Sequence, residues 1–122
     1  LSLNPSMVAS HYNRGCALFN LGRYKEAIED YTKTLEIDPQ DCNAYFNRGS
    51  AYIELGLYHE AIDDFNRTLI LNHEDGEAYF ELGLAYKAIG REKQFLDEMK
   101  KAAKAGFKKA EELLEEHNND PK

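Results

Sequence analysis

The sequence predicts an all-α fold built from tandem helical repeats. The segments that begin at Val8 and Cys42 share 14 identities over 34 positions, where chance would give about two, and the segment that begins at Gly76 shares 8 with the second. Within each unit, apolar residues recur with the helical period of about 3.6 residues on both sides of a central glycine. Two helices per unit and a fixed period together indicate an α-solenoid of three helical hairpins.

Turn residues mark where each helix ends. Glycine adopts the left-handed conformation of a helix C-cap most easily, and it recurs at the expected breaks as Gly22, Gly56, Gly90 and Gly106. Pro5 and Pro39 each follow the second helix of a unit. Polar residues then offer the next helix a cap, as Ser6, Asp41 and Asp75. We therefore expect helices at 7–20, 24–36, 42–54, 58–70, 76–88, 92–104 and 108–117.

The repeat frame divides the chain into five segments. They are the tail of a preceding repeat (1–7), repeat 1 (8–41), repeat 2 (42–75), a divergent repeat 3 (76–109) and a capping helix with a frayed end (110–122). The opening LSLNP parallels LEIDP 34 residues later, so we expect the sequence to be a piece of a longer protein. Ala110, Leu113 and Leu114 give the last segment an apolar stripe that would cover the final repeat.

Composition excludes several classes of protein. The 122 residues carry 15 basic and 22 acidic side chains, for a net charge of −7, and 43% of them are hydrophobic, which is typical of a soluble globular protein. No apolar run reaches the roughly 20 residues of a membrane helix, and the start lacks a secretory signal, so we expect a cytoplasmic protein without a membrane partner. Cys16 and Cys42 form no CxxC pair, and we expect buried, reduced thiols. The histidines are not spaced as metal ligands, so neither a metal nor another cofactor is expected.

Small residues at fixed positions predict close contact between the two helices of each unit. They are Gly15, Gly49 and Gly83 on the first helices and Ala27, Ala61, Thr34 and Thr68 on the second helices. Phe95 stands where the first two units have alanine, and Glu92 replaces their tyrosine. Because overpacking a tight contact costs about 1–3 kcal/mol, we expect either a wider third hairpin or a different contact for Phe95.

This pattern resembles the tetratricopeptide repeat (TPR), a helix–turn–helix unit of 34 residues. The second unit matches the positions that define it with Tyr45, Gly49, Tyr52, Ala61 and Phe65, and the first unit adds Gly15, Ala27, Tyr31 and Pro39. The resemblance covers essentially the whole chain. It implies a right-handed α-solenoid of three hairpins plus a C-terminal capping helix. It also implies a concave groove, lined by the first helix of each unit, in which such proteins bind extended peptides or partner helices.

The groove-facing positions of the first helices give a candidate peptide-binding site. Its residues are Tyr12, Asn13, Cys16, Asn43, Phe46, Asn47, Ser50, Glu77, Phe80, Glu81 and Lys87. The aromatic column of Tyr12, Phe46 and Phe80 would supply apolar contact, although such rings can also serve only to pack the array. Asn13 and Asn47 resemble the asparagine column that holds peptide backbones in O-linked N-acetylglucosamine transferase, since a side-chain amide both donates and accepts hydrogen bonds.

The groove positions differ from those of chaperone-binding TPR domains. Those domains hold a C-terminal carboxylate with lysine, arginine and asparagine side chains, and the matching positions here are Tyr12, Cys16, Asn47, Glu77 and Glu81. Only Asn47 agrees, and two basic residues have become acidic, which would repel a carboxylate. We therefore expect a protein or peptide partner that is basic or neutral.

The sequence lacks catalytic motifs, which predicts a protein that is not an enzyme. It contains no GxSxG, HExxH, P-loop or dinucleotide-binding motif. The acidic pairs Glu29–Asp30 and Asp63–Asp64 do not converge, because neighbouring helix residues point about 100° apart, and we expect them on a solvated outer face. Cys16 and His11 lie too far apart around a helix to act as nucleophile and base.

The sequence thus favours a scaffold or adaptor that holds a peptide or helix in a groove. Residues 87–109 carry 8 basic and 3 acidic side chains, but base-stacking aromatics and arginines are missing around them, so a solvated face is favoured over a nucleic-acid site. Two other classes stay open. One is a structural segment of a longer array, or one that self-associates through an exposed repeat face at 1–7. The other is a regulatory domain of an enzyme elsewhere in the parent chain.

Overall fold

Residues 5–118, the part of the chain that the computed structural model describes, form seven α-helices and no strand. In chain order they are α1 (Pro5–Asn20), α2 (Tyr24–Ile37), α3 (Cys42–Glu54), α4 (Tyr58–Leu71), α5 (Gly76–Ala88), α6 (Glu92–Lys104) and α7 (Lys108–Asn118). Their bounds lie within two residues of those expected. Because α1 begins at Pro5, Ser6 lies inside this helix and is not its cap. The rest of the expected preceding-repeat tail, 1–4, and the last residues, 119–122, lie outside the described residues.

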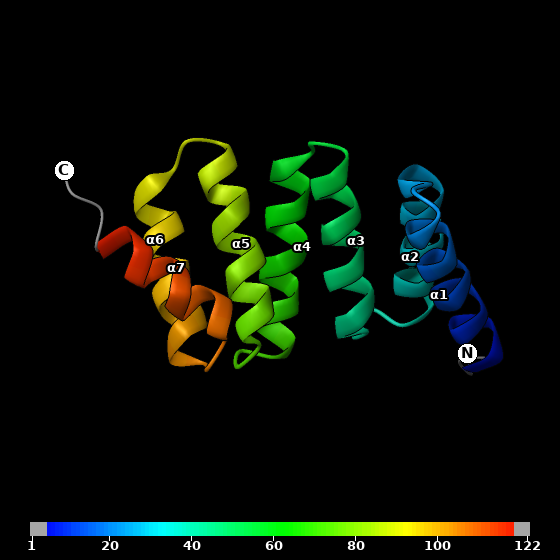
Figure 1. The fold of residues 1–122 in the computed structure, drawn as a ribbon. Helices are drawn as coiled ribbons and strands as arrows, with labels where there is room; N and C mark the ends of the chain where they lie inside the picture. Colours follow the sequence, from blue (N-terminus) through cyan, green and yellow to red (C-terminus); the bar gives the residue numbers. More distant parts are fainter. Residues whose placement is uncertain (1–4, 119–122) are drawn as a thin grey trace.

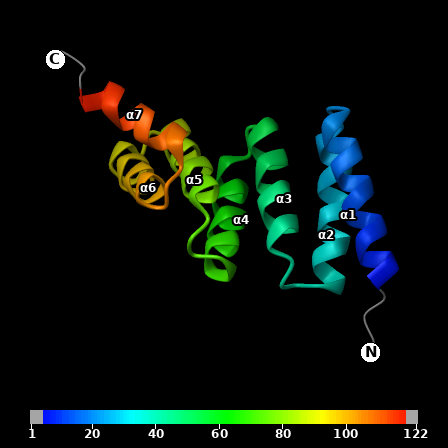
Figure 2. The ribbon, with the colours of Figure 1, turned by 60° about the horizontal axis from the view of Figure 1, so that its bottom comes forward.

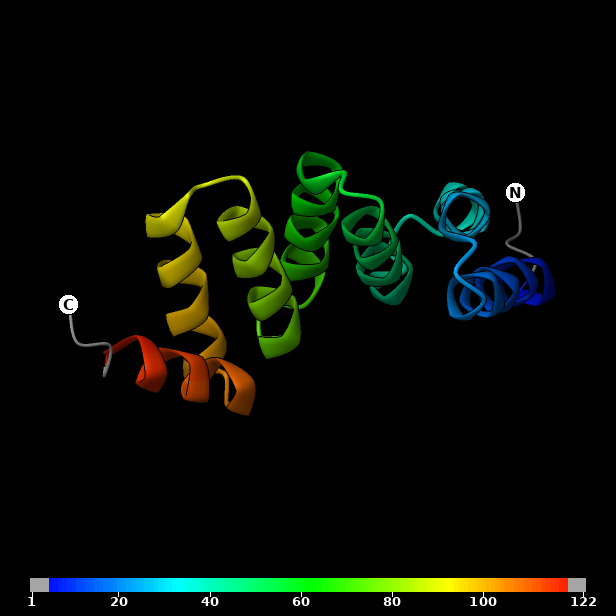
Figure 3. The same cartoon turned by 45° about the horizontal axis from the view of Figure 1, so that its top comes forward.

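The helices stack side by side into an all-α repeat solenoid. Hairpins α1–α2, α3–α4 and α5–α6 follow one another, and they meet where α2 packs on α3 and α4 packs on α5. Consequently α1 and α7 lie at opposite ends of the row (Figure 1), and the helix axes turn from one hairpin to the next (Figure 3). The last helix, α7, packs on α6 and covers the far end of the row (Figure 2). None of the helices in the described part of the chain combines the length and the apolar character needed to cross a membrane.

The expected turn and cap residues hold the helix ends. Gly22, between α1 and α2, has a φ of +78°, a conformation that strains any residue with a Cβ atom. Asp41 accepts a hydrogen bond from the backbone N–H of Ala44 at 3.1 Å, which satisfies one of the unpaired donors at the start of α3. Asp75 caps α5 in the same way. Local sequence therefore fixes where these helices begin and end.

Glycines bring the two helices of each hairpin together. A methyl group at Gly15 would lie 2.8 Å from the ring of Tyr31, and one at Gly49 would lie 2.9 Å from the ring of Phe65. Neither distance leaves room for a side chain, so an aromatic ring of the second helix packs directly on the backbone of the first. Gly83 brings α5 equally close to α6. The predicted close contacts are confirmed in all three hairpins.

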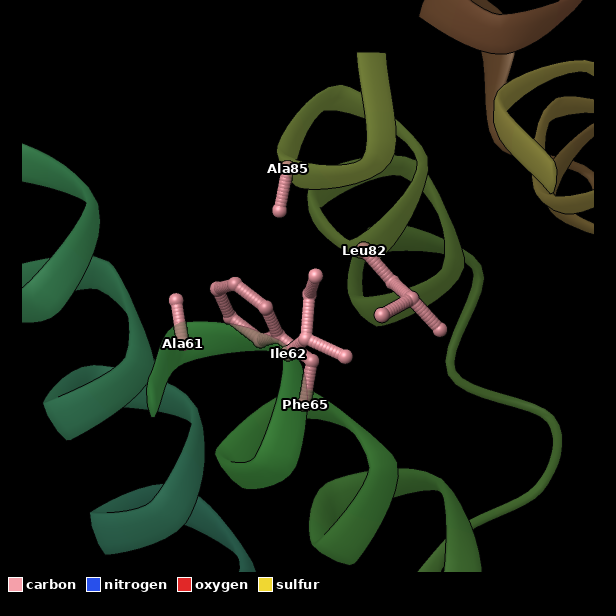
Figure 4. Close-up of a cluster of buried hydrophobic side chains, with 5 residues drawn as sticks. All are labelled: Ala61, Ile62, Phe65, Leu82 and Ala85. Atoms are coloured by element: carbon pink, nitrogen blue, oxygen red, sulfur yellow. The ribbon is translucent and has the colours of Figure 1, made fainter. Parts of the chain in front are cut away.

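The core runs between hairpins as well as within them. One buried cluster joins α4 to α5 across the boundary between the second and third units (Figure 4), and its members are Ala61, Ile62, Phe65, Leu82 and Ala85. Each of these side chains is at most 9% exposed. Burial of this apolar surface is the main force that fixes one hairpin on the next.

The third hairpin is packed as closely as the first two. Its helices meet at Gly83, where a methyl group would lie 2.7 Å from Met99 and 3.3 Å from the backbone oxygen of Phe95. Its turn repeats that of the second hairpin, because the backbone N–H of Arg91 donates to Tyr86 at 2.9 Å as that of Leu57 donates to Tyr52. The expected widening is therefore wrong. Phe95 is only 2% exposed and lies in one buried cluster with Met99, Ala102 and Ala110, with the ammonium of Lys87 at 5.0 Å from its ring centre.

In each of the first two hairpins, an ion pair between an arginine and a buried aspartate joins the two helices. Arg14 donates two hydrogen bonds to Asp30, at 2.7 and 2.8 Å, and Arg48 donates two to Asp64, both at 2.8 Å. Asp30 and Asp64 are 2% and 3% exposed, so the expected solvated outer face is wrong for both aspartates. Arg14 lowers the pKa of Asp30 through these hydrogen bonds. Burial raises the pKa of Asp64 despite Arg48, because this second pair is more deeply enclosed.

Candidate functional site

A hollow of about 410 Å³ opens between α1 and α3. Its lining comes from these two helices and from one ring of α2, and consists of Cys16, Phe19, Asn20, Tyr31, Phe46, Asn47 and Ser50. Four of the predicted site residues therefore meet in one place, namely Cys16, Phe46, Asn47 and Ser50. Aromatic walls combined with a few amide and hydroxyl groups are typical of a site that binds an apolar side chain and its adjoining backbone.

Hydrogen bonds orient the polar groups of the hollow. The Asn47 amide donates to the hydroxyl of Tyr12 at 2.8 Å, which joins α3 to α1. The hydroxyl of Tyr31 donates to the sulfur of Cys16 at 3.4 Å. Burial, more than any neighbouring charge, raises the pKa of Tyr12 to about 12, so this hydroxyl stays protonated at neutral pH. The hydroxyl of Tyr12 thus accepts from Asn47 and also interacts with the thiol of Cys16.

The predicted aromatic column is built into the array. Tyr12 packs on Tyr31 with ring centres 5.9 Å apart, and Phe46 packs on Phe65 at 5.5 Å. Phe80 instead packs at 5.1 Å on the ring of a residue just before α7, Phe107. All three column residues are half-buried. They pack the array and still offer one side to the groove, and contact with a peptide stays a prediction.

The groove turns acidic between α3 and α5. Glu81 on α5 is half-buried, and burial raises its pKa; the carboxylates of Glu77 and Glu54 add to this rise. Lys109 on α7 is the one neighbour that opposes them. Carboxylates therefore outnumber ammonium groups by three to one among Glu81 and the charged groups that influence its pKa. The arrangement favours a cation over an anion.

Several predicted site residues lie outside the hollow. Asn13 and Asn43 are exposed on α1 and α3, and the Lys87 ammonium covers Phe95 instead. Cys16 and Cys42 are both free and both half-buried, so the expectation that they are buried is wrong for both. His11 lies 3.4 Å from Asp30, away from any role as a base for Cys16.

One lining residue was assigned only a packing role by sequence reasoning. The ring of Tyr31 belongs to a second helix, and it reaches the hollow only because Gly15 lacks a side chain. The signal was present in the sequence as a glycine paired with an aromatic residue in each of the first two units. Within residues 5–118, His, Cys, Asp and Glu side chains nowhere gather in a group that could hold a metal ion.

A larger hollow lies near the turn between α4 and α5. Its volume is about 790 Å³, and its lining is His73, Glu74, Tyr79, Lys101, Lys104 and Ala105. The ammonium of Lys101 already lies 3.6 Å from a carboxylate oxygen of Glu98 and 6.0 Å from the ring centre of Tyr79. This hollow lacks the aromatic walls and the oriented amide of the one between α1 and α3, which is therefore the stronger candidate site.

Comparison with solved structures identifies folds of the same kind. The crystal structure of MamA has a TM-score of 0.83 and 28% identity, and the match covers 88% of this chain but only 64% of that one. The first TPR of Spaghetti (RPAP3), bound to the HSP90 peptide SRMEEVD, has a TM-score of 0.80 and 25% identity, with coverage of 92% and 96%. The match to the Arabidopsis OM64 TPR domain has 21% identity and a TM-score of 0.82, and it covers 92% of this chain and 97% of that one. At this identity the match shows the fold alone.

Comparison with protein-family models assigns the chain to a family, and the structural likeness supports this assignment. No curated protein matches the chain. Two models described as tetratricopeptide repeat do match it, one at residues 8–41 and 42–75 and the other at residues 76–113. These matches span most of the sequence and fall on the three hairpins described above. The chain belongs to the tetratricopeptide repeat family.

Proposed function

We propose that the chain is a non-catalytic protein-interaction module that holds an extended peptide or a helix against its first helices. The observation that carries this proposal is the aromatic-walled hollow between α1 and α3, where Tyr12 orients the amide of Asn47 at 2.8 Å. An oriented amide can pair with a peptide backbone without selecting its side chains. The peptide-bound TPR of Spaghetti (RPAP3) supports the proposal, since it holds its peptide on a closely similar fold.

The partner is basic or neutral. Glu77 and Glu81 occupy positions where chaperone-binding TPR domains carry basic residues, and they lie with Glu54 around one stretch of the groove. A C-terminal carboxylate would meet repulsion here, and an acidic peptide such as SRMEEVD is expected to bind poorly. The proposed module therefore shares its fold with chaperone-binding TPR domains and differs from them in the charge of its groove.

Selection from a display library of random 12-residue peptides tests this function. We expect binders to the 122-residue chain, and we expect Ser50→Trp to abolish their binding because the indole fills the hollow. Asn66→Trp is the matched control, since Asn66 is exposed on α4 and does not line that hollow. Circular dichroism checks that both variants stay folded. Recovery of no binder, or of binders that ignore Ser50→Trp, would overturn the proposal.

Self-association is a second candidate function, and a different observation favours it. Ala17 on α1 is exposed and Leu21, just after this helix, is 70% exposed, although the residues at the same repeat position as Ala17, Ala51 on α3 and Ala85 on α5, are fully buried. An apolar helix face of this kind can pair with another copy. Light scattering between about 10 and 500 μM, a range set by typical weak dimers, should show a rising mass if it does; a constant monomer mass would exclude it.

A further inference from the structure

The hollow between α1 and α3 is preformed. Phe19 packs edge-on against Tyr24 at 5.1 Å, and Phe46 packs against Phe65 at 5.5 Å, so both ring walls are held from behind. Rigid aromatic walls lose little conformational entropy when a ligand enters. A bulky apolar side chain gains most from such a site, because it displaces water from three rings at once.

The acidic part of the groove lies one helix further along. Glu81 stands on α5, and the charged groups that face it are Glu77 on the same helix, Glu54 on α3 and Lys109 on α7. The helices α3 and α5 contact each other only weakly, so their axes lie at least the about 8–10 Å of packed helices apart. An extended peptide advances about 3.3 Å per residue. The peptide residue that reaches Glu81 therefore lies about three or more positions from the residue in the hollow.

We propose that the groove recognises two side chains of one extended segment: a bulky apolar residue in the hollow between α1 and α3, and a lysine or arginine about three or more residues away at Glu81. The proposal rests on the proposed function and specifies the chemistry of its partner. The cation would reduce the negative charge of a site where three carboxylates outnumber one ammonium group. Lys109 competes with it, so removing Lys109 should strengthen binding.

Defined peptides test the two positions separately. Each 12-residue peptide carries one leucine and one lysine at a spacing of one to seven residues, in either order, on an alanine–glutamine background. Fluorescence anisotropy with the 122-residue chain should show tightest binding at a spacing of about three or more, and weaker binding at a spacing of one or two. We expect about tenfold weaker binding when lysine is replaced by glutamate. Leucine replaced by alanine should weaken binding by a similar factor.

Variants of the protein then assign each effect to its site. Glu81→Gln should remove most of the preference for lysine over glutamate, and Lys109→Ala should strengthen lysine peptides. Glu111→Gln is the matched control, because Glu111 is exposed on α7 and is not among the groups that influence Glu81. Circular dichroism confirms that each variant is folded.

The outcomes separate this inference from the proposed function. Peptides that lose binding with Ser50→Trp but show no lysine preference would overturn the two-point inference and leave a peptide-binding module intact. A lysine preference that survives Glu81→Gln would overturn the inference in the same way. Absence of any binding peptide, both here and in the library selection, would overturn the proposed function together with the inference.

Discussion

Gly49 shows how the absence of one side chain sets the spacing of two helices. A methyl group there would meet ring atoms of Phe65 at 2.9 Å, and the ring is itself fully buried. The corresponding methyl group at Gly83 would meet the end of the Met99 side chain, at 2.7 Å. A methionine terminus can rotate away, whereas a ring wedged in the core cannot. A methyl group is crowded to a similar degree at both glycines, but it should cost less stability at Gly83 than at Gly49.

Alanine substitutions at these two glycines test this difference. Gly49→Ala should lower the free energy of unfolding by about 1–3 kcal/mol through overpacking, and Gly83→Ala should lower it less. Both substitutions gain the same helix propensity, so that contribution cancels in the comparison. Urea denaturation followed by circular dichroism gives both values. Equal losses would mean that Met99 is as immobile as Phe65.

Glu98 marks where the third hairpin lost its ion pair. Its place in the repeat matches that of Asp30 and Asp64, but their arginine partners are replaced by Leu82. One carboxylate oxygen of Glu98 is buried and has no hydrogen-bond partner among the described residues, and the other lies 3.6 Å from Lys101. Burial raises the pKa of Glu98 above its usual range. An ionised Glu98 therefore destabilises the hairpin.

The pH dependence of this effect has a definite sign. Because the pKa is higher in the folded state, folding binds a proton, and stability falls as pH rises through the range between the unfolded and folded values. Glu98→Gln should raise the free energy of unfolding at pH 7 by about 1 kcal/mol, and the gain should shrink toward pH 4. Glu116→Gln, at an exposed site on α7, is the control. A gain that is constant from pH 4 to pH 7 would contradict ionisation of Glu98 as the cause.

At the scale of the helix, α7 acts as the cover of the last hairpin. It packs mainly on α6, and Phe107, just before it, contacts Phe80 on α5 with ring centres 5.1 Å apart. Its buried Ala110 sits with Phe95 and Met99 in one cluster. In a repeat array each unit is stabilised mainly by its neighbours. Loosening α7 should therefore affect the third hairpin first.

Hydrogen exchange can follow this local effect. Phe107→Ala should destabilise its surroundings by about 2 kcal/mol, less than a fully buried phenylalanine because the ring is only half-buried. Amides of α6 and α7 should lose protection while those of α1–α4 keep theirs. Phe19→Ala, at the other end of the array, should give the opposite pattern. An equal loss of protection in all seven helices would show that the array unfolds as one unit.

At the scale of the whole molecule, the helices could be predicted because their ends depend on local residues. Asp41, Asp75 and the glycines of the turns act within a few positions of the sequence. The Arg14–Asp30 and Arg48–Asp64 pairs were missed because they join separate helices. Only the paired recurrence of arginine and aspartate in two repeats, and their replacement by Leu82 and Glu98 in the third, carried that signal.

The candidate site was predictable in part for the same reason. Repeat phase placed Phe46, Asn47 and Ser50 on one face, and the structure brings them together with Cys16. The ring of Tyr31 was not placed there, because its position depends on the space left by a glycine on another helix. The hydrogen bond from Asn47 to Tyr12 likewise depends on how two units stack. Stacking geometry is the part that a periodic pattern leaves undetermined.

The repeat also places identical residues in different surroundings, which allows a test of how the array is held together. Ala17 on α1 and Ala51 on α3 occupy the same position in successive units, but Ala17 is exposed while Ala51 is fully buried. Ala51→Glu should lower the free energy of unfolding by about 3–5 kcal/mol or prevent folding, because it buries an unpaired charge. Ala17→Glu should change it by less than about 0.5 kcal/mol. Urea denaturation at two protein concentrations measures both, and a large, concentration-dependent loss for Ala17→Glu would instead mean that a second copy covers α1 in solution.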